Sequence, residues 1–198
     1  MAFDGITIAA MVRELHLNLD GGRFNKIAQP EADELLITGK GANGQCRLLL
    51  SASASLPLIY FTSKNKPSPM TAPNFCMLLR KHIGSARFSD IRQPGMERVV
   101  MFELEHLNEL GDPCKKVLIM ELMGKHSNII FCDDKNMILD SIKHVSSHMS
   151  SVREVLPGRE YFIPQTQDKL DPLTVSEELF REVVCRKPCN ISKAIYSS

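Results

Sequence analysis

Four apolar runs between residues 98 and 143 decide the fold: Arg98–His106 (RVVMFELEH), Lys116–Met123 (KVLIMELM), Asn128–Cys132 (NIIFC) and Met137–Lys143 (MILDSIK). Each run has the length and the composition of a β-strand. Residues typical of turns separate them, at Gly111-Asp112 and at Asp133–Asn136. We therefore predict a series of strands joined by tight connections.

The same pattern extends toward the N-terminus. It predicts further strands at Arg23–Gln29, Glu34–Thr38, Cys46–Ser51, Leu56–Phe61 and Phe88–Arg92. Apolar residues at helical spacing predict helices at 5–19, after Asp4, and at 73–83, before Gly84. A sizeable sheet with few helices indicates an α+β fold, built on a mostly antiparallel sheet or sandwich.

The last part of the sequence differs from the rest. A polar connector runs from Pro164 to Pro172, and Thr174 is expected to cap a helix that contains Leu179 and Val183. We predict two domains: residues 1–172, and the start of a helical second domain at 173–198.

Composition excludes several classes of protein. The chain has 198 residues, of which 43% are hydrophobic, and 24 basic side chains nearly balance 23 acidic ones. This is a globular composition, neither disordered nor strongly basic. The charge is nevertheless uneven, because residues 61–98 carry 7 basic and 2 acidic side chains and residues 99–140 carry 4 and 8. Such asymmetry can create a local basic face that attracts a polyanion.

The sequence has neither a run of 18 apolar residues nor the layout of a secretory signal at its N-terminus. We therefore expect a cytoplasmic protein without a membrane partner. The six dispersed cysteines are expected to be reduced.

Motifs for catalysis or cofactor binding are weak. Residues 39–44 match G-x-G-x-x-G, but the strand-like residues that follow indicate a hairpin and no phosphate-binding loop. The pairs His144/His148 and Cys185/Cys189 have the spacing of zinc ligands, although they are about 40 residues apart in the sequence, and ordinary surface residues are the simpler interpretation. No hydrolase or Walker motif occurs. We expect no cofactor, no metal and no enzymatic activity.

Several turn-like stretches place Arg, Lys, His or Asn beside glycine, and such groups hydrogen-bond to RNA phosphates, sugars and bases. With their neighbours, six stretches resemble, in order, the N-terminal domain of the NFACT family, whose bacterial members have been labelled fibronectin-binding protein A. They are Met1–Leu15, Gly22–Pro30, Pro73–His82, Gln93–Arg98, Glu121–Ile130 and residues 157–161. The resemblance covers essentially the whole chain.

The resemblance implies a ribosome quality-control factor. Such a factor binds large ribosomal subunits that carry peptidyl-tRNA and recruits tRNA, here alanine tRNA, for mRNA-independent alanine tailing of the nascent chain. It also implies a fold like the N-terminal domain of formamidopyrimidine-DNA glycosylases, followed by a helix-hairpin-helix. Those glycosylases use an N-terminal proline and a glutamate, whereas this chain begins Met1-Ala2-Phe3, so base excision is not expected. The family's older label leaves a fibronectin-binding surface adhesin as the alternative.

The functionally important acidic and Asp-Arg positions of the family correspond to Asp4 and to Glu97-Arg98, with Glu97 longer by one methylene. Arg98 can bind a phosphate or stack on a base, and the carboxylates can accept from a ribose hydroxyl or an amine. In the simpler interpretation, Asp4 is only a helix cap and Glu97 and Arg98 face opposite sides of a strand. Four further cations are predicted to support phosphate contacts: Arg23, Lys26, Arg80 and Lys81.

Overall fold

The computed structural model describes residues 3–108, 110–164, 170–171 and 174–198. The chain divides into two compact units, residues 1–162 and 163–198. The break lies beside the polar connector that the sequence indicates. The predicted domain boundary at 172–173 falls outside the described residues.

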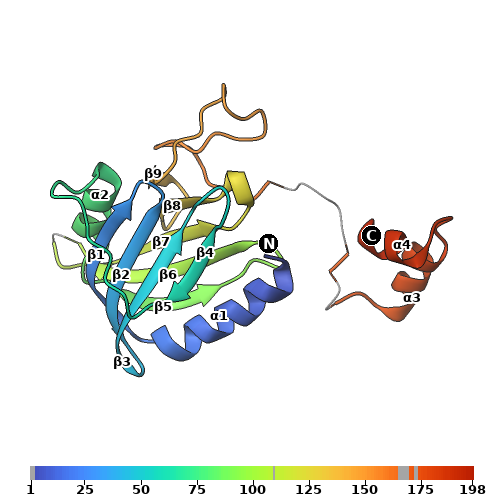
Figure 1. The fold of residues 1–198 in the computed structure, drawn as a ribbon, viewed down its shortest axis with the longest axis horizontal. Helices are drawn as coiled ribbons and strands as arrows, with labels where there is room; N and C mark the ends of the chain where they lie inside the picture. The colour runs from blue at the N-terminus through green and yellow to red at the C-terminus, as the bar shows by residue number, and fades with distance from the viewer. Residues whose placement is uncertain (1–2, 109, 165–169, 172–173) are drawn as a thin grey trace. The chain divides into compact units, whose positions relative to one another are not determined.

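The first unit is built on a sheet of nine strands in the order β4-β3-β2-β1-β5-β6-β7-β8-β9, and every pairing among the described residues is antiparallel (Figure 1). The strands are β1 (Arg23–Glu31), β2 (Glu34–Gly41), β3 (Gly44–Ser51), β4 (Leu58–Phe61), β5 (Arg87–Arg92), β6 (Val99–Leu107), β7 (Pro113–Glu121), β8 (Asn128–Asp133) and β9 (Ile138–Ser141). The predicted α+β fold with a mostly antiparallel sheet is confirmed. A short 3₁₀ turn, η1 (Gly124–His126), connects β7 to β8.

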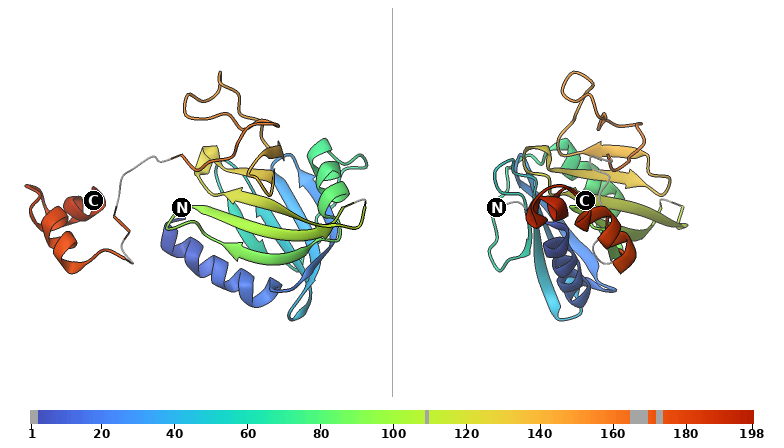
Figure 2. Two further views of the ribbon diagram at one scale, coloured as in Figure 1. Left: turned by 180° about the vertical axis from the view of Figure 1, so that it is seen from behind. Right: turned by 90° about the vertical axis from the view of Figure 1, so that its right-hand side faces the viewer.

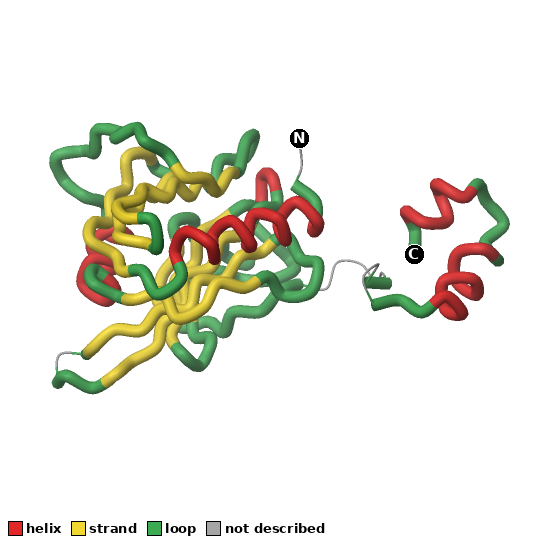
Figure 3. Tube along the Cα trace, turned by 90° about the horizontal axis from the view of Figure 1, so that it is seen from below, coloured by secondary structure: helices red, strands yellow, loops and turns green. Residues whose placement is uncertain are grey.

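Two helices pack against the sheet. Helix α1 (Gly5–Leu19) contacts β2, β5 and β6, and α2 (Asn74–Ile83) contacts β1, β6 and β9. Figure 3, seen from below, shows α1 lying lengthwise over the strands. One core joins the helices and alternate residues of the strands, for example Ile8, Phe24, Leu79, Phe102 and Phe131. The strand period of two therefore turns the intervening residues of β1, β2 and β3 to the opposite, outer face.

Strands β1 and β5 join the two halves of the sheet at a single register pair, Arg23 opposite Arg87. Two backbone hydrogen bonds flank this pair, from Phe24 N to the Ala86 carbonyl and from Phe88 N to the Gly22 carbonyl, each 2.9 Å. The remaining strands pair over several residues each. The outer face of this junction is thus formed by the first residues of both strands.

The G-x-G-x-x-G stretch forms a hairpin, as predicted. Gly39 and Gly41 lie at the end of β2, Gly44 begins β3, and these two strands pair in continuous register. A side chain at Gly41 would clash with the Asn18 carbonyl at the end of α1. Gly41 therefore permits close packing between the helix and the hairpin, Gly39 permits close approach of the β1 backbone, and Gly44 adopts the positive φ of the turn, so the glycines are explained without a nucleotide.

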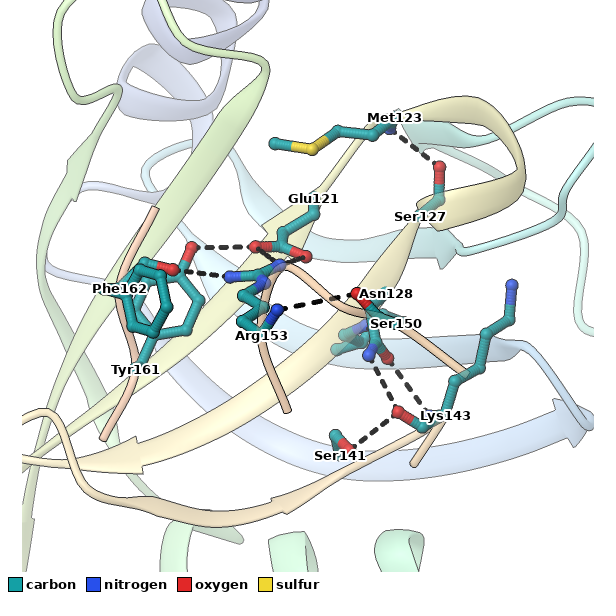
Figure 4. Close-up of polar contacts among 11 residues, drawn as sticks. Glu121, Met123, Ser127, Asn128, Ser141, Lys143, Ser150, Arg153, Tyr161 and Phe162 are labelled. Carbon is teal, nitrogen blue, oxygen red and sulfur yellow. Dashed lines mark hydrogen bonds and ion pairs between the residues drawn. The ribbon is translucent and has the colours of Figure 1, made fainter. Parts of the chain in front are cut away.

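The segment after β9, residues 142–162, runs beside β8 and β9 (Figure 1). A buried polar cluster holds it in place (Figure 4). The Arg153 guanidinium donates to both carboxylate oxygens of Glu121 at 2.5 and 2.6 Å, and the Tyr161 hydroxyl donates to the same carboxylate at 3.0 Å. Arg153 also donates to the carbonyl of Phe162, the last residue of this unit.

The second unit contains α3 (Glu177–Phe180), a π-helical turn η2 (Arg181–Cys185) and α4 (Ile191–Tyr196). The predicted cap at Thr174 is wrong. Ser176 caps the first helix instead, because its hydroxyl accepts from the Leu179 backbone N–H at 3.2 Å. Asn190 caps α4 in the same way through Lys193 N, at 2.9 Å.

Candidate functional site

The N-terminal end of α1 lies against the loop that joins β5 to β6, residues 93–98 (Figure 2). Gln93 connects the two: its side-chain amide donates to the Gly5 carbonyl at 2.9 Å and to the Glu97 carbonyl at 2.8 Å. A Cβ on Gly5 would clash with the Met96 carbonyl. Asp4 and the pair Glu97-Arg98, which are more than 90 residues apart in sequence, are thus brought to one place.

Asp4 is the N-cap of α1. Its exposed carboxylate accepts from the Thr7 backbone N–H at 2.7 Å. This hydrogen bond lowers the pKa of Asp4 below its ordinary value, because it stabilises the charged form. The cap predicted by the simpler interpretation is present. A capping carboxylate uses one oxygen for the helix, so the other oxygen remains available to a ligand.

Glu97 and Arg98 precede β6, which begins at Val99, one residue later than expected. Glu97 is exposed and Arg98 is half-buried. Their backbones are fixed by bonds from Glu97 N to the Pro94 carbonyl and from Leu122 N to the Arg98 carbonyl. Neither charged group has a hydrogen-bond or ion-pair partner among the described residues. The loop therefore presents one free cation and one free carboxylate on an anchored backbone.

The four supporting cations lie elsewhere. Arg23 and Lys26 are exposed on β1, beyond the C-terminal end of α1, and this helix of 15 residues is about 22 Å long. Arg80 lies on α2, where its Nε donates to the Ile27 carbonyl at 2.7 Å. Lys81 also lies on α2 and has an interaction partner within the chain. The structure thus assembles Asp4, Glu97 and Arg98 but places the other cations apart from them.

Sequence reasoning did not assign roles to Gly5 and Gln93. Gly5 was a detectable signal, because glycine has a low helix propensity and yet is the first residue of the helix, directly after the N-cap. Close approach of another backbone explains it. Gln93 gave no such signal, since its two acceptors are carbonyls from segments 88 residues and 4 residues away.

The structure also bears on whether the chain could hold a metal ion or cross a membrane. Among the described residues, no three His, Cys, Asp or Glu side chains are arranged to hold a metal ion. His144 pairs with Asp140 at 2.6 Å, and all six cysteines are free thiols. In the described part of the chain, no helix is both long enough and apolar enough to span a membrane.

The site thus combines a free guanidinium, two carboxylates and a helix N-terminus on one anchored loop junction. A guanidinium can bind a phosphate through two parallel hydrogen bonds or stack on a base, whereas a carboxylate accepts from hydroxyls and amines. Groups of opposite charge on adjoining segments suit a ligand that carries both phosphates and hydrogen-bond donors. RNA is such a ligand.

Comparison with known proteins places this chain in one class, the NFACT N-terminal and middle domains, whose family model matches residues 4–198. The chain belongs to the NFACT family. It is 42% identical over 181 residues, 90% of its length, to the Rqc2 homolog RqcH of Bacillus subtilis, and 37% identical over 93% of its length to RqcH of Streptococcus suis. Human ribosome quality control complex subunit NEMF is 27% identical over 94% of this chain. The chain spans about a third of the length of the two RqcH proteins, 31% and 34%, and 16% of NEMF.

Solved structures agree. The N-terminal part of the fibronectin/fibrinogen-binding protein of Streptococcus suis has a TM-score of 0.87 at 37% identity, covering 94% of this chain and 70% of that one. The N-terminal domain of fibronectin-binding protein PavA of Streptococcus pneumoniae also has a TM-score of 0.87, at 33% identity, covering 98% and 78%.

Proposed function

We propose that this chain is the N-terminal part of a cytoplasmic ribosome quality-control factor that binds stalled large ribosomal subunits carrying peptidyl-tRNA. The factor recruits tRNA, with alanine tRNA as the substrate, for mRNA-independent C-terminal alanine tailing of the nascent chain. Membership of the NFACT family and the names of the RqcH and NEMF relatives support this proposal. The contribution of this chain is RNA binding without chemistry of its own, and the ribosome forms the peptide bonds.

One observation carries the proposal: the Arg98 guanidinium has no partner within the described chain and lies on the loop that Gln93 ties to the start of α1. A half-buried arginine without a carboxylate partner is held ready for an external anion. In our proposal, Arg98 binds a tRNA phosphate or stacks on a base. Glu97 and Asp4 then accept from a ribose hydroxyl, a base amine or the ammonium of a charged aminoacyl group.

The test is recovery of the tagged protein from its native cells, followed by sequencing of the bound RNA. We expect wild type to recover large-subunit ribosomal RNA together with a tRNA set enriched in alanine tRNA, and Arg98→Ala to lose the tRNA while retaining the ribosomal RNA. Lys135→Ala is the matched control, because it removes the same charge from the exposed β8–β9 turn. Equal tRNA recovery by wild type and Arg98→Ala would exclude the proposed role of this residue.

Substitutions at the two acids separate charge from structure. Asp4→Asn keeps a side chain that caps helices well but removes the charge, whereas Asp4→Ala removes both. Loss of tRNA in both variants assigns a ligand contact to the Asp4 charge, and loss in Asp4→Ala alone assigns Asp4 to capping. Glu97→Asp restores the residue typical of the family and is expected to keep tRNA binding, while Glu97→Gln is expected to weaken it.

Fibronectin binding is the second candidate, favoured by the names of the solved structures that share this fold. In this case the protein would act as a surface adhesin. Saturable binding of the purified chain to immobilised fibronectin, together with loss of the protein when intact cells are treated with protease, would support it. Recovery of ribosomal RNA without either result would exclude it.

A further inference from the structure

Three cations lie directly opposite one another across three adjacent strands. Lys40 on β2 pairs in register with Arg23 on β1, and Arg23 pairs with Arg87 on β5. Their neighbours in sequence, Gly39, Phe24 and Phe88, include two core residues, so the three cations occupy the outer face of the sheet. All three are exposed. We call them the cationic row.

The outer face carries two more cations beside the row. Lys26 and Arg47 both pair with Thr38 of β2, from opposite sides, and Arg47 donates to the Ser63 carbonyl at 3.3 Å. Within the described residues, none of these five cations forms an ion pair with a carboxylate. Two acids are nearby: Glu105 lies opposite Arg87 but pairs with Lys115 at 3.7 Å, and Asp20 is exposed beside Gly21.

This arrangement does not stabilise the isolated protein, because like charges directly opposite each other in a sheet repel. It occurs where the two halves of the sheet meet through one register pair, a position that would benefit from attraction across the strands. Stability therefore gives no reason for the cationic row. An external polyanion removes the repulsion.

A shallow cavity of about 310 Å³ opens beside the row; its lining includes Arg23, Asn25 and Lys40, and also the carboxylate residue Asp20. The Arg87 guanidinium lies close to Gly21, so the third cation reaches the same place. The C-terminal end of α1 also lies here, and its dipole disfavours an anion, so the cations must outweigh it. Two of its last carbonyls accept backbone hydrogen bonds, Leu19 from Gly22 N and Asn18 from Ala42 N.

We propose that the cationic row binds the phosphate backbone of an RNA strand, at a surface distinct from the Asp4–Arg98 site. Neighbouring strands are about 4.8 Å apart, so three cations span about 10 Å. Along the axis of a double helix each strand carries a charge about every 3.4 Å, so this length corresponds to at most about three phosphates of one strand. The Asn25 amide in the cavity can hydrogen-bond to a ribose or base edge. The choice of RNA among polyanions rests on the proposed function.

The test measures binding of a fluorescent single-stranded RNA of mixed sequence to the purified 198-residue chain by anisotropy, between roughly 50 and 200 mM salt. Lys40→Gln, Arg87→Gln and the triple variant with Arg23→Gln are compared with wild type. The slope of log affinity against log salt is negative, and each lost phosphate contact makes it shallower by about 0.7. We therefore expect the slope of the triple variant to be shallower than that of wild type by about 2. The neutral variants are expected to unfold at temperatures no lower than wild type, because repulsion is removed.

Lys135→Gln is the matched control, and Arg98→Ala separates the two surfaces. In both variants we expect the cationic row to contribute as much to the salt dependence of RNA affinity as it does in wild type. Three results would overturn the proposal: no RNA binding by wild type, equal slopes for wild type and the triple variant, or an equal loss in Lys135→Gln. Binding of the row to vesicles containing phosphatidylserine, without RNA binding, would assign it to a membrane surface instead. None of these outcomes depends on recovery of tRNA from cells, so this proposal and the proposed function fail separately.

Discussion

At the scale of single residues, Glu121 is the most constrained charge in the described chain. Its side chain is 0% exposed, and that of its partner Arg153 is 10% exposed. Burial alone would lower the pKa of Arg153, but the hydrogen bonds and charge of Glu121 more than reverse this and raise it. The pKa of Tyr161 is raised by burial and by the neighbouring carboxylate, so its hydroxyl stays protonated as a donor. The cluster is a buried, hydrogen-bonded ion pair that attaches residues 153–162 to β7.

Removing one partner of this pair is expected to be strongly destabilising. We predict that Arg153→Met lowers the free energy of unfolding by about 3–5 kcal/mol, because it leaves a buried carboxylate uncompensated. Arg159→Met is the matched control: Arg159 pairs with Glu154 in the same segment but its side chain is 61% exposed, and such pairs contribute about 0–1 kcal/mol. Urea denaturation measures both, and similar losses in the two variants would contradict the assignment.

At the scale of elements, α1 organises both surfaces described above. Its N-terminal end meets the 93–98 loop through Gly5, and its C-terminal end meets the β2–β3 hairpin through Gly41. Each contact brings two backbones together at a position where a side chain would not fit. The helix therefore fixes the Asp4–Arg98 site at one end and the surroundings of the cationic row at the other.

This packing predicts a substitution whose effect opposes helix propensity. Alanine is favoured over glycine in helices by about 1 kcal/mol, yet Gly5→Ala is expected to lower stability by about 1–3 kcal/mol because the Cβ forces the Met96 carbonyl away. Ala10→Gly, at an exposed position of the same helix, isolates the propensity effect. Thermal and urea unfolding check the sign, and a Gly5→Ala protein more stable than wild type would refute the close contact.

At the scale of the whole molecule, the first unit contains the complete main core. All members of the main cluster lie between Ile8 and Phe131, whereas Val184 and Ala194 are the buried apolar residues of the second unit's described part. A unit of 162 residues buries about 70% of the surface of its unfolded chain, which suffices for independent stability.

We therefore predict that a chain ending at Phe162 unfolds cooperatively in urea. A chain ending at Val152, only ten residues shorter, lacks Arg153 and Tyr161 and leaves Glu121 buried without its partners. It is expected to be markedly less stable or to aggregate. Circular dichroism during denaturation compares the two, and equal midpoints would show that the cluster is not needed to complete the unit.

Much of the fold could be predicted from local pattern, because strand and helix periods depend on residues close in sequence. The helix at 5–19 has the predicted bounds, and each strand of the first unit occurs within a few residues of its predicted position. The differences arise where tertiary contacts override local signals. The helix start expected at Thr174 occurs after Ser176, since both hydroxyl residues can act as caps and only the fold selects one.

The sequence by itself determined the α+β class, the hairpin at the glycine-rich stretch, and the charged residues from which a site could be built. Only the tertiary structure decided which of those residues meet. Gln93 and Gly5 bring Asp4 to Glu97 and Arg98, whereas strand register places Arg23 with Lys40 and Arg87 at the other end of α1. The physical reason is that periodicity records which face of an element is buried, while pairing between distant elements depends on register and close packing, which no local pattern specifies.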